Sequence, residues 1–342
     1  MAGVLYYLFF QCTGFCLVFA FCQKKSPAAD FFTRLLFGSC TGSLLFTWLP
    51  ILFSFLFDFT LTAHIAAAIT AVCLILLFFR HFRPKREYKK GNFTAPHILF
   101  FLCFAAFMGF FGYLLHTHTL LPGENDGLFT GQSTYGDMNM HLGFITSLAT
   151  THTFPPEYSI FPGTRLSYPF LCVSCSSSLL LLGSSLRLAY ILPMLFAMGQ
   201  IFCIVYLTAL NFTKSHVKGI LTLIFFFLNG GLGFLYFFSL FGNAAYSFSN
   251  ILTGFYTTPT NLTEQNIRWV NLIADMFLPQ RATLFGYAVL FPALFLLYRA
   301  AFCKDSCLFL PAGLFVSALP MIHTHSFLSA GIISACWLLL CL

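Results

Sequence analysis

A carboxylate and an imidazole stand four positions apart in the segment YGDMNMHL, residues 135–142. In a helix this spacing places Asp137 and His141 on the same face. An acid and a histidine side by side can move a proton or contribute ligands to a metal ion. The structural alternative is that Asp137 caps the start of the helix, where the helix dipole favours a negative charge.

Acidic residues are scarce in this chain and unevenly placed. Of the ten Asp and Glu, four lie between residues 116 and 168 and two more between 243 and 281: Glu124, Asp126, Asp137, Glu157, Glu264 and Asp275. Lipid excludes charged groups, which explains why acids occupy loops. It does not explain why they favour these two loops. We therefore expect any chemistry to take place there.

Basic and imidazole side chains offer partners for an anion. Arg281 opens a long apolar run, and a guanidinium binds phosphate oxygens in a bidentate manner. Arg281, with Gln280 beside it and Arg165 as a further candidate, is predicted to bind a phosphate. His323 and His325 are candidates for binding a metal ion or the phosphate. The alternatives are an interfacial anchor for the arginine and structural roles for the histidines.

The composition indicates what class of protein carries these side chains. Hydrophobic residues make up 58% of the 342 residues and charged residues 8%, whereas soluble domains carry roughly 25% charged residues. Apolar runs of about 20 residues recur, as a bilayer requires. The prediction is an integral, multi-pass membrane protein in contact with the lipid bilayer. Its expected fold is an all-α bundle of about ten spans in a single transmembrane domain, 1–342.

Two other classes are disfavoured by the sequence. A nucleic-acid-binding protein needs a basic surface patch interleaved with polar contacts, and this chain has none. Cys172 and Cys175 have the spacing of a metal or redox pair, but no second pair or histidine follows nearby. Most of the 13 cysteines lie in apolar runs, where cysteine behaves as a small hydrophobic residue.

The apolar runs give an order of spans and loops. Expected spans are 3–22, 35–56, 60–79, 96–115, 169–185, 190–209, 282–300 and 307–321, with 219–242 either continuous or broken at Asn229-Gly230-Gly231. The broken form is preferred, because it places 12 of the 17 Lys and Arg in the cytoplasm, with Arg299 and Lys304 beside a short inner loop. It also places both acid-bearing loops on the same side of the membrane. These are the first large outer loop, 116–168, with a surface helix at 138–150, and the second outer loop, 243–281.

The positive-inside rule orients this arrangement. The basic cluster at 80–90 is expected in the cytoplasm, which places His323 and His325 outside. In this topology Arg187 occupies an inner turn, while Lys214 and Lys218 lie in an outer turn as exceptions to the rule. The chain ends inside an apolar run, as expected of a C-terminally truncated protein.

Several motifs in order resemble a known family. Gly136-Asp137 with His141 is followed by FPP at 154–156, PGTRLSYPF at 162–170, LNGGLGF at 228–234 and LPQRA at 278–282. Over roughly residues 96–330 the chain resembles bacterial GT-C membrane glycosyltransferases. It differs from them in the three additional spans before the first large loop and in lacking a second acid next to Asp137, which leaves a metal requirement open.

The resemblance implies a function. Such an enzyme transfers a sugar from a polyprenyl-phosphate carrier to a glycan, lipid or protein acceptor of the cell envelope. Transfer takes place on the non-cytoplasmic face of a bacterial plasma membrane. The resemblance assigns Asp137, with His141 nearby, the role of base or metal ligand, and a divalent cation such as Mg²⁺ or Mn²⁺ is a candidate cofactor.

Two other functions remain open at this point. A secondary transporter would place ionisable groups at mid-membrane on paired broken helices. Here only one segment is broken, and His64 is almost the only titratable residue deep in a span. A non-catalytic partner in envelope assembly is the other alternative.

Overall fold

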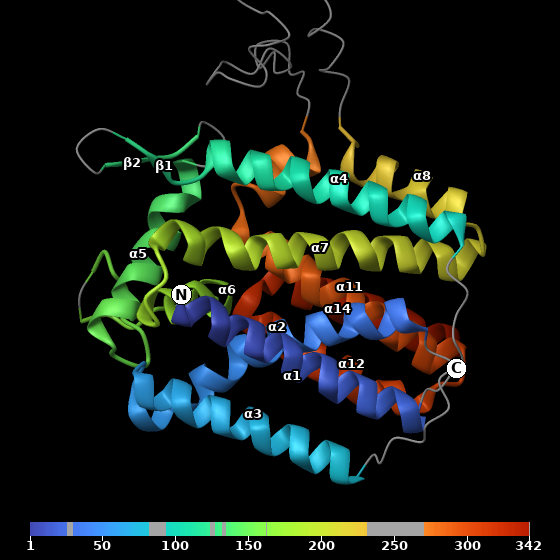
Figure 1. The fold of residues 1–342 in the computed structure, drawn as a ribbon, viewed down its shortest axis with the longest axis horizontal. Helices are drawn as coiled ribbons and strands as arrows, with labels where there is room; N and C mark the ends of the chain where they lie inside the picture. Colours follow the sequence, from blue (N-terminus) through green and yellow to red (C-terminus); the bar gives the residue numbers. More distant parts are fainter. Residues whose placement is uncertain are drawn as a thin grey trace, which may run out of the picture.

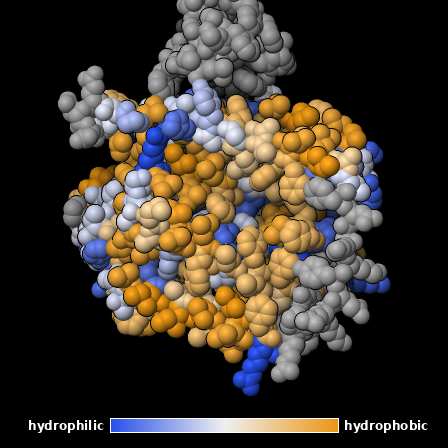
Figure 2. Space-filling model, in the orientation of Figure 1, coloured by the Kyte–Doolittle hydropathy of each residue, from blue (hydrophilic) through white to orange (hydrophobic). Residues whose placement is uncertain are grey.

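Most of the residues that the structure describes lie in helices. The computed structural model describes residues 1–25, 30–81, 94–123, 127–131, 135–161, 163–230 and 270–341. Within these residues, seven helices are long and apolar enough to cross a membrane (Figure 1). Figure 2 shows hydrophobic residues over most of the visible face of the bundle. The expected all-α polytopic membrane protein is thereby confirmed, whereas the number of about ten spans stays a prediction.

The long helices run along one common direction in Figure 1. They are α1 (Ala2–Lys25), α2 (Phe31–Phe57), α3 (Leu61–His81), α4 (Ala95–His118), α7 (Leu186–Thr213), α11 (Arg281–Phe302) and α14 (Thr324–Cys341). Short polar side chains cap the N-termini of two of these helices. Asp30 accepts a hydrogen bond from the Thr33 amide (2.6 Å) at the start of α2, and Ser185 accepts one from the Leu188 amide (3.3 Å) at the start of α7.

Shorter elements lie between the long helices. They are the strand pair β1 (Leu121–Pro122) and β2 (Leu128–Phe129), α5 (Tyr135–Thr151), α6 (Leu171–Leu181), α8 (His216–Phe227), a π-helical turn (Leu272–Phe277), a 3₁₀ turn (Ser306–Leu308), α12 (Phe309–Val316) and α13 (Leu319–Ile322). The strands are antiparallel, with Leu121 opposite Phe129. At about 1.5 Å per residue, none of these elements is long enough alone to cross a bilayer core of roughly 30 Å.

Small residues bring α1 and α2 into backbone contact. A Cβ atom built on Gly14 would lie 2.2 Å from the carbonyl oxygen of Gly38 and 2.3 Å from the amide nitrogen of Gly42. No side chain larger than hydrogen fits there. Membrane helices commonly associate through such small-residue contacts, because lipid supplies no hydrophobic drive between helices.

A neutral polar network ties α7 to this pair of helices. The Nε2 of Gln200 donates to the hydroxyls of Ser39 (3.0 Å) and Ser43 (2.9 Å), and Gln11 bonds the same two serines at 3.0 Å each. Hydrogen bonds between helices stabilise membrane bundles modestly. All these groups are uncharged, so the network has the character of a structural contact.

The bundle has two distinct ends. We call the end at which α5 lies the α5 end; it includes Ala2, Phe57, His118 and Leu186. Here the Phe59 amide, between α2 and α3, donates 2.8 Å to the carbonyl of His152, just after α5. In Figure 1, α5 runs across the ends of α4 and α7. It matches the surface helix expected at 138–150, and its observed bounds are 135–151.

The segment 169–185 does not form the span expected from its hydropathy. It contains α6, whose 11 residues are too short to cross. The carbonyl of Leu182, at the end of α6, accepts a hydrogen bond from the Gly3 amide (3.1 Å) at the start of α1. Arg187 then donates 2.7 Å to the carbonyl of His116 in the last turn of α4. Arg187 therefore lies at the α5 end, and the expected inner turn was wrong.

The expected position of the turn after α7 was also wrong. His216, which begins α8, has its ring 5.4 Å from that of His97 at the start of α4. Lys214 also lines one cavity with Arg299, near the end of α11. Lys214 and Lys218 thus lie at the end opposite α5, not in an outer turn. We call this the basic end.

With Lys214 and Lys218 at the basic end, the distribution of Lys and Arg between the two ends follows the positive-inside rule better than the expected topology did. Among the nine Lys and Arg whose side chains the structure describes, six belong to the basic end: Arg34, Arg80, Lys214, Lys218, Arg299 and Lys304. Arg165, Arg187 and Arg281 belong to the α5 end. The rule that places basic residues in the cytoplasm then assigns the α5 end to the opposite face of the membrane.

The expected break near Asn229-Gly230 agrees with the structure as far as it is described. Helix α8 ends at Phe227, and the side-chain Nδ2 of Asn271 donates 2.9 Å to each of the carbonyls of Phe227 and Asn229. Residues 231–269, which hold Glu264 and most of the second outer loop, lie outside the described residues. So do Glu124 and Asp126 of the first loop and most of the basic cluster at 80–90.

Candidate functional site

A cavity of about 270 Å³ opens at the α5 end of the bundle. It is formed by α5, the residues just before α6, the start of α11 and the junction between α13 and α14. Its lining residues are Asp137, His141, Tyr168, Pro169, Gln280, Ala282, Thr283, Ile322, His323, Thr324 and His325. Five of the seven residues singled out from the sequence therefore line one cavity.

Helix α5 contributes the carboxylate and one imidazole. Asp137 lies exposed in its first turn, and His141 lies one turn later with 1% of its surface exposed. The Nδ1 atom of His141 is buried without a hydrogen-bond partner among the described residues. Burial, together with the positive charge of Arg281, lowers the pKa of His141 to about 4. The imidazole is therefore neutral at pH 7.

The facing wall is built by α11 and the α13–α14 junction. His323 Nδ1 lies 2.8 Å from the hydroxyl of Ser326, and its Nε2 lies 3.5 Å from that of Thr283. Thr283 in turn donates 3.1 Å to the side-chain carbonyl of Gln280. These contacts hold the His323 ring from both sides and fix its orientation toward the cavity.

Two neighbouring histidines lie on this wall. The ring centroids of His323 and His325 are 5.4 Å apart. Burial and the adjacent His325 lower the pKa of His323. In the described part of the chain, no group of three or more His, Cys, Asp or Glu side chains is arranged to hold a metal ion. The predicted divalent-metal site thus does not fit the donors as they stand, and no step below involves a metal.

Arg281 lies behind the cavity wall and not in the lining. Its side chain is completely buried. Nε donates 2.9 Å to the carbonyl of Cys172, Nη1 donates 2.8 Å to that of Tyr190, and Nη2 donates 2.5 Å to the hydroxyl of Ser176. The guanidinium also contacts the faces of the Tyr190 and Phe285 rings. Direct contact between Arg281 and a phosphate, as predicted, does not agree with this position.

Among the residues that the structure describes, Arg281 forms no salt bridge. Among the described residues the single salt bridge joins Arg299 to Asp305 at the basic end. Neutral oxygens and a sulfur satisfy the guanidinium instead. A buried charge without a counter-ion retains a strong field in a medium of low dielectric. The cavity therefore lies next to a fixed positive charge.

Three other sequence-based candidates lie away from the cavity. Arg165 is exposed on the loop after α5, where it pairs through the backbone with Glu157. Asp275 accepts a 2.7 Å hydrogen bond from the Asn271 amide, and burial raises the pKa of this carboxyl. His64, near the start of α3, lies 2.9 Å from Ser178 and is not at mid-bundle, so it offers no support for a transporter.

Tyr168 and Thr283 line the cavity but received no role from the sequence. Tyr168 belongs to the SYPF segment that precedes α6, and its ring lies 6.2 Å from that of His141. Burial raises the pKa of Tyr168 to about 12, so the phenol keeps its proton. A signal was present, since Tyr168 and the LPQRA segment before Thr283 belong to the motifs quoted above.

Comparison with known proteins adds no family to this description. No protein-family model matches the chain. No curated protein and no solved structure matches it significantly. The functional conclusion therefore depends on the geometry of the cavity and on its position in a multi-pass membrane protein.

Proposed function

We propose that this chain is a membrane glycosyltransferase that moves a sugar from a polyprenyl-phosphate carrier to an envelope glycan, lipid or protein. The α5 end is its active face, on the non-cytoplasmic side of a bacterial plasma membrane. One observation carries the proposal. The cavity unites Asp137 of the surface helix α5 with His323 and His325 at the distant end of the chain.

Asp137 is the general base in this proposal. The acceptor hydroxyl loses its proton to the carboxylate as its oxygen forms a bond to the anomeric carbon of the sugar. The bond between that carbon and the phosphate oxygen breaks, and polyprenyl phosphate leaves with the electron pair. The exposure of Asp137 at the mouth of the cavity supports this role, because a base must reach the acceptor.

The departing phosphate gains negative charge as the sugar leaves. The buried guanidinium of Arg281 stabilises this charge through its field, without touching the phosphate. Gln280 and His325 line the cavity and supply the direct hydrogen bonds. His323, whose two ring nitrogens face Ser326 and Thr283, forms the wall beside them. This assigns Arg281 a positioning and electrostatic role in place of the direct phosphate contact expected from the sequence.

A transfer assay tests this function. Membranes containing the full chain are supplied with a radiolabelled polyprenyl-phosphate hexose, and label in envelope material is measured. The Asp137→Asn variant keeps the size of the side chain and removes the base, so we expect transfer to fall at least about 100-fold. Glu157→Gln is the matched control, because this acid lies in the same loop but outside the cavity. Undiminished transfer in Asp137→Asn would exclude the assignment.

A further inference from the structure

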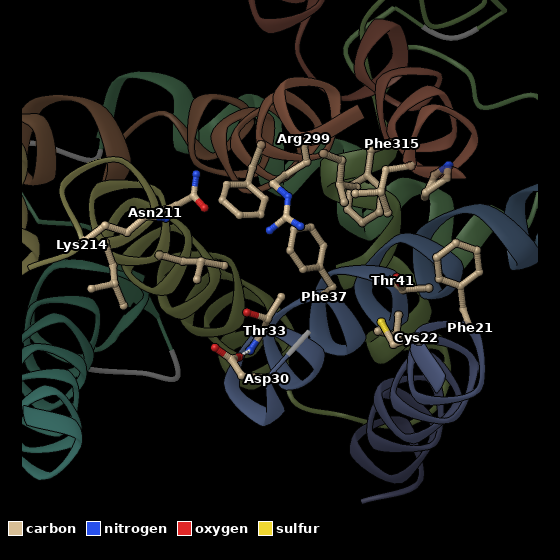
Figure 3. A pocket seen from close by; sticks show the side chains of 17 residues that line it. Phe21, Cys22, Asp30, Thr33, Phe37, Thr41, Asn211, Lys214, Arg299 and Phe315 are labelled. Atoms are coloured by element: carbon tan, nitrogen blue, oxygen red, sulfur yellow. Dashed lines mark hydrogen bonds between the residues drawn. The ribbon is translucent and has the colours of Figure 1, made fainter. Parts of the chain in front are cut away.

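A second cavity lies at the basic end of the bundle, far along the helices from the proposed active site. It has a volume of about 390 Å³ and is enclosed by the ends of α1, α7 and α11, the start of α2, and α12 (Figure 3). None of its lining residues lines the cavity at the α5 end. It therefore requires an explanation of its own.

The interior of this cavity is apolar. Phe37 and Phe295 face each other with ring centroids 5.9 Å apart, and Phe315 completes an aromatic wall. Leucines from three helices fill the spaces between these rings: Leu207, Leu210, Leu296 and Leu308. A surface of this kind receives hydrocarbon, and its volume falls in the range of sites that enclose small ligands.

Polar side chains gather where the cavity meets the helix ends. Asp30, Thr33, Asn211, Lys214 and Arg299 belong to its lining. In Figure 3 the guanidinium of Arg299 points into the space between α2 and α7. The cavity is therefore amphipathic, with an apolar interior and a polar rim.

Several rim groups have unused hydrogen-bonding capacity. Arg299 donates from Nε (2.9 Å) and Nη2 to the same oxygen of Asp305. Within the described residues, its Nη1 has no partner, nor do the side-chain amide of Asn211 and the ammonium group of Lys214. Three donor groups on one rim without a protein partner among the described residues favour an anionic group with several acceptor oxygens.

The net charge of the basic end is positive. Six described Lys and Arg gather there, whereas the described acids at that end are Asp30 and Asp305. Basic pockets between membrane helices on the cytoplasmic side are suited to the phosphate groups of anionic lipids. We propose that this cavity binds one anionic glycerophospholipid of the cytoplasmic leaflet, with its phosphate at Lys214, Asn211 and Arg299 and an acyl chain between Phe37, Phe295 and Phe315.

Asp30 can bind the alcohol part of the lipid headgroup. Its Oδ1 accepts the Thr33 amide, which caps α2, and its other oxygen has no partner among the described residues. That oxygen can accept a hydrogen bond from a headgroup hydroxyl. Phosphatidylglycerol, which combines an anionic phosphodiester with hydroxyls, is therefore the probe of choice.

Native mass spectrometry of the full chain in detergent measures this binding directly. Phosphatidylglycerol and phosphatidylcholine with the same acyl chains are titrated separately, and we expect the protein to retain phosphatidylglycerol preferentially. Lys214→Gln should weaken its binding about fivefold, the usual effect of one basic residue near an anionic lipid. Lys218→Gln is the matched control, because Lys218 shares the basic end but does not line the cavity.

A second variant tests the apolar interior without changing charge. Leu210→Trp fills the cavity and should abolish retention of phosphatidylglycerol, while the unfolding temperature in lipid-free detergent shows whether the variant is folded. Equal retention of both lipids would overturn the proposal. Equal losses in Lys214→Gln and Lys218→Gln would also overturn it, because they would indicate diffuse surface attraction. Displacement of the lipid by inorganic phosphate would identify a soluble anion as the ligand and overturn it as well.

Discussion

Gly286 and His323 approach so closely that a Cβ atom on the glycine would lie 2.6 Å from Cβ of the histidine and 2.7 Å from its Nδ1. The same Cβ would lie 2.7 Å from the hydroxyl of Ser326. Glycine in α11 thus allows the α13–α14 junction to rest against this helix. The position of the His323 imidazole in the candidate site therefore depends on the absence of a side chain at Gly286.

Replacing this glycine should displace His323. In Gly286→Ala we expect glycosyl transfer to fall at least tenfold, because displacement of a positioning group by about 1 Å can cost about 100-fold. The transfer assay measures this loss. Gly331→Ala is the control, since a Cβ atom at Gly331 in α14 meets nothing within 4 Å. Equal activity of the two variants would contradict the proposed importance of the contact.

The buried His141 should make stability depend on pH. The folded pKa is about 4 and the ordinary value is 6.5, so the unfolded chain takes up a proton first as the pH falls. Stability is then lost between about pH 6.5 and pH 4. From pH 7 to pH 5 the loss from this group is on the order of 2 kcal/mol.

Thermal unfolding in detergent at several pH values measures this effect. The decline from pH 7 to pH 5 should be smaller in His141→Gln than in the wild-type chain, because glutamine does not titrate. His325→Gln serves as the control at an exposed imidazole of the same cavity. An identical decline in the wild-type chain and in His141→Gln would show that the imidazole titrates as it does in water.

The long helices could be predicted from the sequence because each is a continuous apolar run between polar residues. The runs 35–56, 60–79, 96–115, 190–209 and 282–300 correspond to α2, α3, α4, α7 and α11. Their observed ends extend a few residues further at most boundaries, since hydrogen bonds continue beyond the apolar stretch. The surface helix α5 could also be predicted, from its short length and mixed polarity.

Helix α6 shows what hydropathy leaves out. The run at 169–185 is apolar enough for a span, but hydropathy does not distinguish a surface facing lipid from one facing protein. Its serines are buried and bonded to neighbouring segments. Ser177 donates 3.1 Å to the carbonyl of Ile145, and Ser176 donates 2.5 Å to that of Ala189. Helix α6 ends after 11 residues, just before Gly183, whose φ of +79° favours glycine. Because α6 does not cross, α7 begins at the α5 end and runs in the direction opposite to the expected one.

The candidate site was predictable in part for a related reason. Asp137, His141, Gln280, His323 and His325 could be grouped because they lie in polar segments that the sequence predicts on the same side of the membrane. The burial of Arg281 could not be foreseen, because its partners are carbonyls of α6 and α7, about 100 positions away in the sequence. A charged residue at the start of an apolar run suggests a surface position, and tertiary contacts override this.

Arg281 should be essential for stability as well as for transfer. Arg281→Met removes the hydrogen bonds to the Cys172 and Tyr190 carbonyls, and a hydrogen bond made by a charged group contributes about 1.5–3 kcal/mol. We expect a large drop in the unfolding temperature in detergent. Arg165→Met, at an exposed position outside the cavity, should change stability by less than about 0.5 kcal/mol.

Arg281→Lys separates the charge from the hydrogen bonds. Lysine keeps the positive charge but lacks the planar fork that reaches both carbonyls. If the field of the cation assists the leaving phosphate, Arg281→Lys should retain more transfer per folded molecule than Arg281→Met. Equal residual activity of the two variants, measured on the folded fraction, would contradict an electrostatic role.

Accessibility labelling tests the reversal of α7 that α6 imposes. Single cysteines replace Arg187 and Lys214 in a chain whose native cysteines have been removed, and intact cells are treated with a membrane-impermeant maleimide. Arg187 contacts the end of α4 at the α5 end, so position 187 should react in intact cells. Lys214 lines the cavity at the basic end with Arg299, so position 214 should react only after permeabilisation.

The same labelling experiment tests on which side of the membrane the proposed active site lies. Arg187 and Asp137 lie at one end of the bundle, and a reagent that reaches position 187 should reach position 137 from the same side. A Lys304→Cys variant marks the basic end independently and should behave like position 214. Should positions 187 and 214 both react in intact cells, α7 would not cross the membrane. The cavity at the α5 end would then lose the helix whose Tyr190 carbonyl holds Arg281.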